Sequence, residues 1–178
     1  DEIGIEGQSK IIASHALVIG AGGLGSPAAL YLASAGVGRI TLADGDTVDL
    51  TNLQRQILHT QDRIGMLKAR SGQMALAQIN PEVAVEPITE RLAGEQLEAL
   101  IANVDIVLDC CDNFATRYAV NRACVKHGTP LVSGAAIRFS GQLSVFDCRR
   151  ADTPWYHCLF PEGEEVEETR CAVMGIFA

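Results

Sequence analysis

The stretch Ala16-Leu-Val-Ile-Gly-Ala-Gly-Gly-Leu-Gly25 decides the fold. Its first four residues form a short apolar run, which is typical of a strand buried on both faces. Gly20, Gly22 and Gly25 then match the pattern G-x-G-x-x-G, whose glycines let the backbone turn tightly. Ser26-Pro27 suits the start of a helix, because proline has no N–H group to satisfy there. The stretch therefore predicts a strand, a glycine turn and a helix in direct succession.

Strands and helices continue to alternate after this unit. The sequence predicts helices over residues 28–35, 61–79, 95–101 and 116–127, and strands over residues 39–43, 83–85, 104–109, 130–133 and 142–146. This alternation favours a mostly parallel sheet. Residues 142–146 alternate polar and apolar side chains, which suits an antiparallel strand with one solvated face. We therefore expect an α/β fold, with a Rossmann-like, mostly parallel sheet, helices on both faces and an antiparallel extension near the C-terminus.

The size of the chain fits one domain. The sequence has 178 residues, of which 48% are hydrophobic, enough to bury a substantial core. Asp1 is not an initiator methionine, and the apolar run 172–178 stops without a cap or a turn. We therefore expect a single domain over residues 1–178 that is truncated at both ends.

Charge and composition narrow the function classes. A formal net charge of -8 argues against nucleic-acid binding, which needs clustered Lys and Arg. No apolar run approaches the roughly 20 residues that span a bilayer, so we expect no membrane partner. No signal peptide is visible, and the six cysteines are interpreted as reduced thiols. These features together favour a cytoplasmic protein.

The glycine turn predicts a nucleotide site. Gly20, Gly22 and Gly25 let the backbone approach a phosphate, and the helix N-terminus supplies N–H donors to an anion. Asp44 ends the next strand, where a carboxylate can accept hydrogen bonds from ribose hydroxyls. The motif alone favours NAD or FAD, and a tight turn without a ligand is the alternative.

A polar cluster after Asp44 favours a triphosphate instead. Asn52 and Gln54 can donate hydrogen bonds to phosphate oxygens, and Arg55 can do so with two N–H groups at once. Lys68 lies on the helix that follows and could reach the same phosphates. Its alternative is a place on the solvated face of that helix.

Two further polar residues, Asp112 and Asn113, follow the strand predicted at residues 104–109. Ligands of open α/β sheets bind beyond the carboxyl ends of strands, so Asp112 and Asn113 should point toward the nucleotide. Asp112 suits Mg²⁺, although it could instead cap the following helix. We expect Arg117 to form a structural or surface ion pair. No acid–base residue of a dehydrogenase stands out.

Eight short pieces of the sequence match one family together: Gly20-Ala-Gly-Gly-Leu-Gly25, Gly36-Val-Gly38, Asp44-Gly-Asp46, Asn52-Leu-Gln-Arg-Gln56, Lys68, Ile79-Asn-Pro81, Asp109-Cys-Cys-Asp-Asn113 and Ser133-Gly-Ala-Ala136. The chain resembles the ThiF/MoeB/HesA family, bacterial relatives of the ubiquitin-activating enzymes, over nearly its whole length. The run from Asn52 to Gln56, taken with the glycine turn and Asp112-Asn113, is the most specific part.

The resemblance implies an activity, cofactors and partners. It implies that ATP and Mg²⁺ are used to adenylate the C-terminal glycine of a ubiquitin-like sulfur-carrier protein with a Gly-Gly C-terminus. The carrier would be ThiS-like or MoaD-like and would serve thiamine or molybdopterin biosynthesis, and the enzyme would be a homodimer. The implied roles are nucleotide contact by Gly23, ribose binding by Asp44, phosphate binding by Asn52, Arg55 and Lys68, and Mg²⁺ binding by Asp112 with Asn113 beside it.

Three departures from the family pattern matter. An Arg-Tyr-x-Arg-Gln segment, from which an arginine reaches the partner subunit in relatives, is absent. The family's zinc site of two C-x-x-C pairs reads Trp155-Tyr-His-Cys158 here, and the second pair would fall beyond Ala178, so we expect no intact zinc site. Cys171 matches a cysteine that takes part in sulfur transfer in ThiF-like members. We therefore count it with Arg55, Lys68 and Asp112 as a candidate catalytic residue.

Three hypotheses stay open on the sequence. The adenylyltransferase accounts for all the motifs, and the thiamine branch is slightly favoured over the molybdopterin branch. An NAD- or FAD-dependent oxidoreductase accounts for the glycine turn and Asp44 but not for Asn52–Gln56 or Asp112. A catalytically silent, nucleotide-bound scaffold for a carrier protein is the third.

Overall fold

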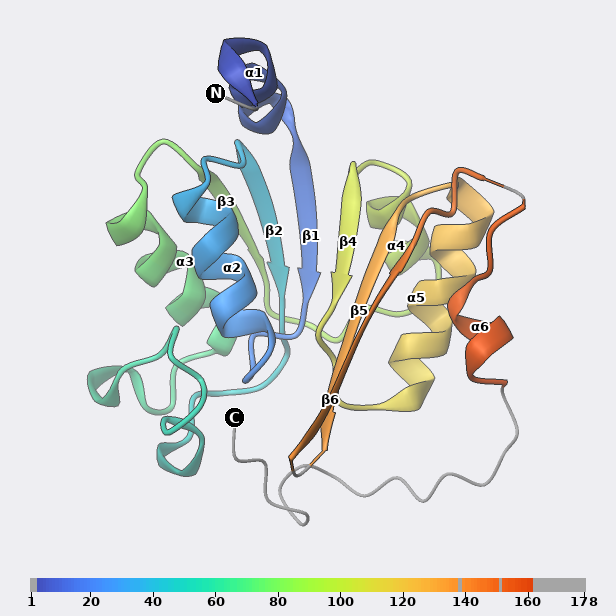
Figure 1. The fold of residues 1–178 in the computed structure, drawn as a ribbon. Coiled ribbons are helices and arrows are strands. Elements are labelled where there is room, and N and C mark those ends of the chain that lie inside the picture. Colours follow the sequence, from blue (N-terminus) through green and yellow to red (C-terminus); the bar gives the residue numbers. More distant parts are fainter. Residues whose placement is uncertain (1–2, 138, 151, 162–178) are drawn as a thin grey trace.

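A computed structural model of the chain describes residues 3–137, 139–150 and 152–161 (Figure 1). Six strands form one sheet in the order β3-β2-β1-β4-β5-β6. Their bounds are β1 His15–Ile19, β2 Arg39–Ala43, β3 Ala84–Ile88, β4 Ile106–Asp109, β5 Leu131–Ile137 and β6 Ser140–Phe146. The first five strands are parallel and β6 pairs with β5 antiparallel. The predicted fold class, including the antiparallel extension, is confirmed.

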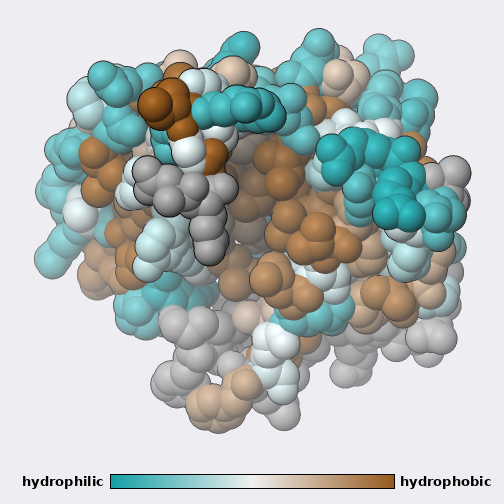
Figure 2. Space-filling model, turned by 45° about the horizontal axis from the view of Figure 1, so that its top comes forward, coloured by the Kyte–Doolittle hydropathy of each residue, from teal (hydrophilic) through white to brown (hydrophobic). Residues whose placement is uncertain are grey.

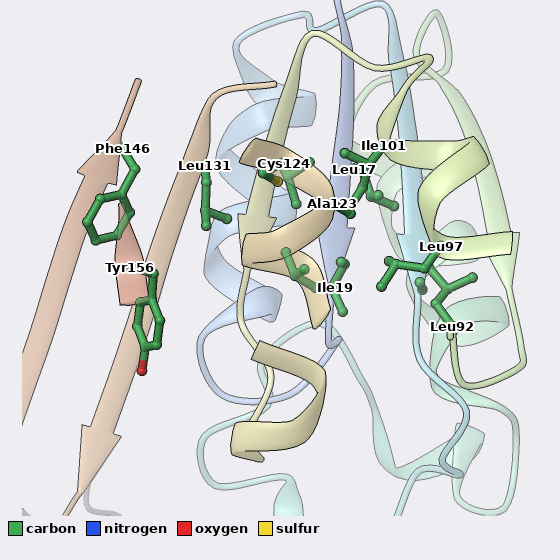
Figure 3. Packing of buried hydrophobic residues seen from close by; sticks show 13 residues of the cluster. Leu17, Ile19, Leu92, Leu97, Ile101, Ala123, Cys124, Leu131, Phe146 and Tyr156 are labelled. Atoms are coloured by element: carbon green, nitrogen blue, oxygen red, sulfur yellow. The ribbon is translucent and has the colours of Figure 1, made fainter. Parts of the chain in front are cut away.

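The helices cover both faces of the sheet. They are α1 Gly4–Ala13, α2 Gly25–Ser34, α3 Lys68–Ile79, α4 Gly94–Ile101, α5 Phe114–His127 and the short α6 Tyr156–Leu159. Two hydrophobic clusters hold them in place. Ala29, Ala33 and Leu76 of α2 and α3 pack on one face, and residues of α4 and α5 such as Leu97 and Cys124 pack on the other (Figure 3). None of the helices in the described ranges has the length and apolar character that a membrane crossing requires.

Among the described residues, no helix covers one face of the edge strand β6. Phe146 packs against the α5 side, so Leu143 and Val145 project from the opposite face of β6, where they are 74% and 70% exposed. Figure 2 shows hydrophobic residues gathered around a hollow on the face that it presents. The fold thus leaves apolar surface near the edge strand.

Several predicted bounds were wrong. The helix predicted over residues 61–79 begins only at Lys68, because Gln61–Arg63 is a 3₁₀ turn and Gly65 adopts φ +85°. An isolated bridge between Thr47 and Leu67 holds this segment as a loop. Strand β5 runs on to Ile137, and α1 and α6 were not predicted. Short strands and helices that depend on tertiary partners are the ones that local patterns miss.

The sheet order creates the site. It is the doubly wound order, in which β1 to β3 are added toward one side of the sheet and β4 to β6 toward the other. Ligands of such sheets bind where the strand order reverses, here between β1 and β4, beyond the carboxyl ends of the strands. The glycine turn follows β1, Asp44 follows β2, and Cys110–Asn113 follow β4. In Figure 1 the arrowheads of these strands point to the same edge of the sheet.

Candidate nucleotide-binding and adenylation site

A cavity of about 500 Å³ lies at this edge. Its wall combines segments that are far apart in the sequence. The predicted site residues that line it are Gly20, Gly22, Gly23, Asp44, Arg55, Lys68, Asp112 and Asn113. The fold therefore brings the glycine turn, the acid after β2, two cations and the turn after β4 to one place.

The glycine turn is set by close backbone packing. Gly20 has φ +96°, and a Cβ there would lie 2.7 Å from the carbonyl oxygen of Cys110. A Cβ on Gly25 would collide with the carbonyl of Gly20. Gly25 is buried in the first turn of α2 and does not line the cavity. Its role here is to let the helix begin directly against the turn, rather than to touch a ligand.

Ala21 is fixed from both sides. Its N–H donates to Asp44 Oδ2 at 2.8 Å, and Asp44 Oδ1 accepts from the N–H of Asp46 at 2.8 Å. The Ala21 carbonyl lies 2.8 Å from His59 Nε2, so this nitrogen must carry the ring proton, and Nδ1 then accepts from the Ser71 hydroxyl. Burial lowers the pKa of His59, which keeps it neutral. The side chain of His59 thus positions the glycine turn.

Arg55 lies directly over the glycine turn. A Cβ on Gly23 would be 3.4 Å from Arg55 Cδ, so the glycine makes room for this side chain. With its amide oriented to satisfy both ends, Gln54 donates to the carbonyl of Thr51 and accepts from Arg55 Nη1 at 3.0 Å. Asn52 accepts the N–H of Arg55 at its carbonyl. Asn52 and Gln54 do not line the cavity, and they shape the loop that carries Arg55.

Lys68 is buried, not solvated. Its side chain is 8% exposed at the first turn of α3, and its Nζ lies 3.6 Å from Asp46 Oδ2. Arg91 approaches the other oxygen of Asp46 at 3.5 Å. All three side chains line the cavity. The alternative of a solvated helix face for Lys68 is therefore wrong, and Asp46 and Arg91 are additional charged residues of the wall.

The turn after β4 is held by a buried arginine. Arg117 Nη2 donates to the carbonyls of Cys111 at 2.6 Å and Gly134 at 2.9 Å, and Arg117 Nη1 donates to Ser133 Oγ. Burial is the largest single effect and lowers the pKa of Arg117, but the raising effects of Asp109, Cys111 and Tyr156 together outweigh it, so the pKa is raised. The prediction of a structural ion pair for Arg117 is borne out by this geometry.

Asn113, and not Asp112, caps the helix that follows. The side chain of Asn113 accepts from the N–H of Thr116 at 2.9 Å. Asp112 is exposed at the cavity wall, between this cap and the cysteine pair. Its carboxylate is therefore available to a ligand, while the Asn113 side chain is engaged by the backbone.

The cysteines near the turn are poor nucleophiles. Burial raises the pKa of Cys110 to about 12 and raises that of Cys111 further. Cys111 Sγ donates to Asp109 Oδ1 at 2.7 Å. Cys124 is fully buried in the core. These three thiols are therefore poorly suited to nucleophilic chemistry, although Cys110 and Cys111 also line the cavity. Cys171 lies outside the described residues.

Aromatic side chains form one part of the cavity wall. Tyr118 stacks on Phe114 with ring centroids 6.2 Å apart, and Tyr156 lies 4.9 Å from Phe160. Ala135 and Ala136 of β5 and Gln142 of β6 line the same cavity. Sequence reasoning missed this wall and also Gln56, which was quoted within a motif but given no role. The aromatic spacing along α5 was the available signal.

The described residues contain no group of three or more His, Cys, Asp or Glu side chains placed to hold a metal ion. The expectation of no intact zinc site stays a prediction, because the second pair of ligands would fall beyond Ala178.

Known proteins are similar to this chain over most of its length. A model of the ThiF family matches residues 1–178. The chain is 47% identical to the sulfur carrier protein ThiS adenylyltransferase of Escherichia coli, over 99% of this chain and 69% of that protein. It is 49% identical to the molybdopterin-synthase adenylyltransferase of Escherichia coli, over 86% of this chain and 61% of that protein.

A solved structure shows the same fold. The crystal structure of E. coli MccB with ATP matches with a TM-score of 0.78 and 26% identity, over 85% of this chain and 45% of that chain. The chain thus spans less than two thirds of several proteins that it matches. Since the family model covers the whole chain, and a relative is nearly half identical over more than two thirds of its own length, the chain belongs to the ThiF family.

Proposed function

We propose that this protein uses ATP to adenylate the C-terminal glycine carboxylate of a ubiquitin-like sulfur-carrier protein, with release of pyrophosphate. One observation carries the proposal: Arg55 and Lys68, from a loop and a helix, enter the same cavity as the glycine turn, Asp44 and Asp112. Two cations are more than a dinucleotide pyrophosphate needs, whereas a triphosphate that is cleaved requires them. The adenylyltransferase relatives support the same reading.

The chemistry needs no general base. The carrier's α-carboxylate has a pKa near ~3.5 and is ionised at neutral pH. Its oxygen attacks the α-phosphorus of ATP, the bond from this phosphorus to the β-phosphate bridging oxygen breaks, and that oxygen leaves with pyrophosphate. Negative charge grows on the phosphate oxygens, and Arg55 and Lys68 stabilise it. Asp44 holds the ribose, and the N-terminus of α2 faces the phosphates.

The position of Asp112 in the cavity wall suits a Mg²⁺ ion that binds together with the nucleotide. Asp112 is exposed there, and the described residues offer no cage of several acidic ligands. Mg²⁺ in nucleotide sites commonly takes one or two carboxylates, with phosphate oxygens and water completing its shell. When bound, the ion neutralises phosphate charge. Asp112 is therefore the proposed protein ligand.

The carrier would enter beside the aromatic part of the cavity wall. The small residues Ala135 and Ala136 leave room beside β5 for the C-terminal tail of the carrier. A Gly-Gly tail has no side chains, so it is the narrowest peptide segment that could enter there. Relatives act on ThiS or serve molybdopterin synthase, so either a ThiS-like or a MoaD-like carrier fits the proposal. The homodimer and a part for Cys171 in sulfur transfer stay predictions.

ATP–pyrophosphate exchange on the full-length protein tests the proposal. The assay contains Mg²⁺ and either a ThiS-like or a MoaD-like carrier, and each carrier is also used without its last glycine. Exchange with an intact carrier only would support adenylation and would identify the pathway. No exchange with either carrier, despite ATP binding, would favour a silent scaffold.

Arg55→Ala adds a matched test. It should reduce exchange at least about 100-fold, because a charge-assisted bond to the reacting phosphates is lost. Arg70→Ala is the control, since Arg70 is exposed on α3 and does not line the cavity. Equal exchange rates in the two variants would remove Arg55 from the proposed mechanism.

A further inference from the structure

His59 is a buried polar residue that lies behind the glycine turn and outside the cavity. It is 5% exposed, and neither His59 nor Ala21 lines the cavity, whereas Gly22 does. Its Nε2 donates to the carbonyl of Ala21 at 2.8 Å, and the Ser26 hydroxyl reaches the same oxygen only at 3.4 Å. His59 is therefore the closer of these two donors to a carbonyl in the middle of the turn.

The peptide between Ala21 and Gly22 carries this bond through to the cavity. No peptide bond among the described residues is cis, and a trans peptide is planar, so the N–H of Gly22 points opposite to the carbonyl of Ala21. Because the carbonyl points back at His59, the N–H points toward the cavity that Gly22 lines. Within the described chain this N–H has no acceptor, so it is available to an anion. The direction of one donor at the phosphate end is thus set by His59.

The other ring nitrogen of His59 ties the turn to α3. Nδ1 accepts from the Ser71 hydroxyl at 2.9 Å, which keeps the ring proton on Nε2. Ser71 is fully buried and lies three residues after Lys68, on the same face of the helix. The carbonyl of Ser71 accepts in turn from Arg63 Nη1 at 2.9 Å. His59 thus holds the helix that supplies the Lys68 ammonium against the turn that supplies the N–H.

We infer that His59 is a positioning residue of the adenylation site, which aims the Gly22 N–H at a phosphate oxygen and sets its distance from the Lys68 ammonium. The inference rests on the proposed function for the identity of the ligand. His59 does not line the cavity, so it acts only through Ala21 and Ser71. Such support matters because a misplacement of about 1 Å, even from a change far from the reacting atoms, can cost about 100-fold in rate.

Two amide variants of the full-length protein separate this role from packing. The Nε2 of glutamine can take the place of the histidine Nε2, whereas the amide of asparagine is one methylene shorter and stops near the place of Nδ1. His59→Gln should therefore keep the dissociation constant for ATP with Mg²⁺ within about threefold of the wild type. His59→Asn should raise it about tenfold, because the bond to the Ala21 carbonyl is lost. The dissociation constant for adenosine, which has no phosphate, should change by less than about twofold in both.

Ser71→Ala tests the same arrangement from the side of α3. It removes the hydroxyl that fixes the tautomer and should weaken ATP binding about threefold, again without affecting adenosine. Alanine favours helices, so α3 stays intact, and this variant decides the question if His59→Asn does not fold. His127→Asn, at an exposed position on α5, is the control for the substitution itself and should bind ATP as the wild type does.

The outcomes separate this inference from the proposed function. Equal ATP binding by His59→Gln and His59→Asn, or equal losses for adenosine and ATP, would overturn the role of His59 and leave adenylation in place. A wild-type protein that binds ATP but shows no pyrophosphate exchange with either carrier would overturn the proposed function, while the amide variants would still decide the role of His59. A wild-type protein that binds no ATP would overturn both.

Discussion

Asp109 and Arg117 form a buried ion pair at the carboxyl end of β4, with 3.5 Å between Asp109 Oδ2 and Arg117 Nε. Asp109 is completely buried, and Arg117 Nη2 donates to a backbone carbonyl of β5 and to one of the turn that contains Asp112. The guanidinium of Arg117 thus joins the end of β4 to the neighbouring strand β5. It lies beside the turn that carries Asp112, the candidate Mg²⁺ ligand. The predictions below begin with this pair.

Arg117→Ala should destabilise the fold by about 3–5 kcal/mol, because it leaves the Asp109 carboxylate buried without a counter-charge. Urea denaturation of the full-length protein measures this. Arg149→Ala is the control: Arg149 pairs with Asp147 at the surface, where such pairs contribute at most about 1 kcal/mol. Similar losses in the two variants would show that the buried pair is not needed for stability.

Gly25→Ala should also be destabilising, by about 1–3 kcal/mol or more, because the added methyl group collides with the carbonyl of Gly20. Gly141→Ala serves as the control, since a Cβ there would lie 3.9 Å from the nearest atom. Thermal unfolding of both variants checks the prediction. An unchanged melting temperature for Gly25→Ala would mean that α2 can shift away from the turn without loss.

The same residues show how far the sequence leads. The strand, turn and helix around Gly20–Gly25 are local, so periodicity and glycine spacing predicted them. Asp44 and Asp112 were placed correctly at the cavity because each directly follows a strand whose position in the sheet follows from the alternation of strands and helices.

Side chains held by distant partners were not predictable in this way. The burial of Lys68 depends on the bridge between Thr47 and Leu67, which directs the loop so that α3 begins at the cavity. No local signal distinguishes Asn52 and Gln54, which shape the loop, from Arg55, which reaches the cavity. The position of His59 became clear only when the carbonyl of Ala21 was found beside its ring.

His59 predicts how stability depends on pH. Burial is the largest cause, and it lowers the folded-state pKa of His59 below the ordinary value of 6.5. The hydrogen bond to the Ala21 carbonyl raises this pKa and the charge of Lys68 lowers it, but the net direction is down. The unfolded chain therefore binds a proton near pH 6.5 that the folded protein does not. The His59 contribution to stability is fully present above pH 6.5 and is lost as the pH falls toward the folded-state pKa.

Thermal unfolding between pH 8 and pH 5.5 measures this. His15, whose pKa is also lowered mainly by burial, adds to the same slope. His59→Gln should flatten part of it, because glutamine does not titrate. If His59→Gln keeps the full wild-type slope, the titrating group lies elsewhere.

Lys68 and Asp46 give the last prediction, which concerns the nucleotide. Lys68 Nζ lies 3.6 Å from Asp46 Oδ2, so an arriving phosphate must compete with this carboxylate for the ammonium. Lys68→Ala should weaken ATP binding by about 10- to 100-fold, since a partly buried cation is lost from the phosphate end. Lys126→Ala, on the exposed side of α5 where it pairs with Glu98, is the control and should leave the ATP dissociation constant unchanged. Isothermal titration calorimetry with ATP and with adenosine separates the phosphate effect from a general loss of the site. If Lys68→Ala weakens both ligands equally, Lys68 supports the cavity wall through Asp46 and does not bind phosphate.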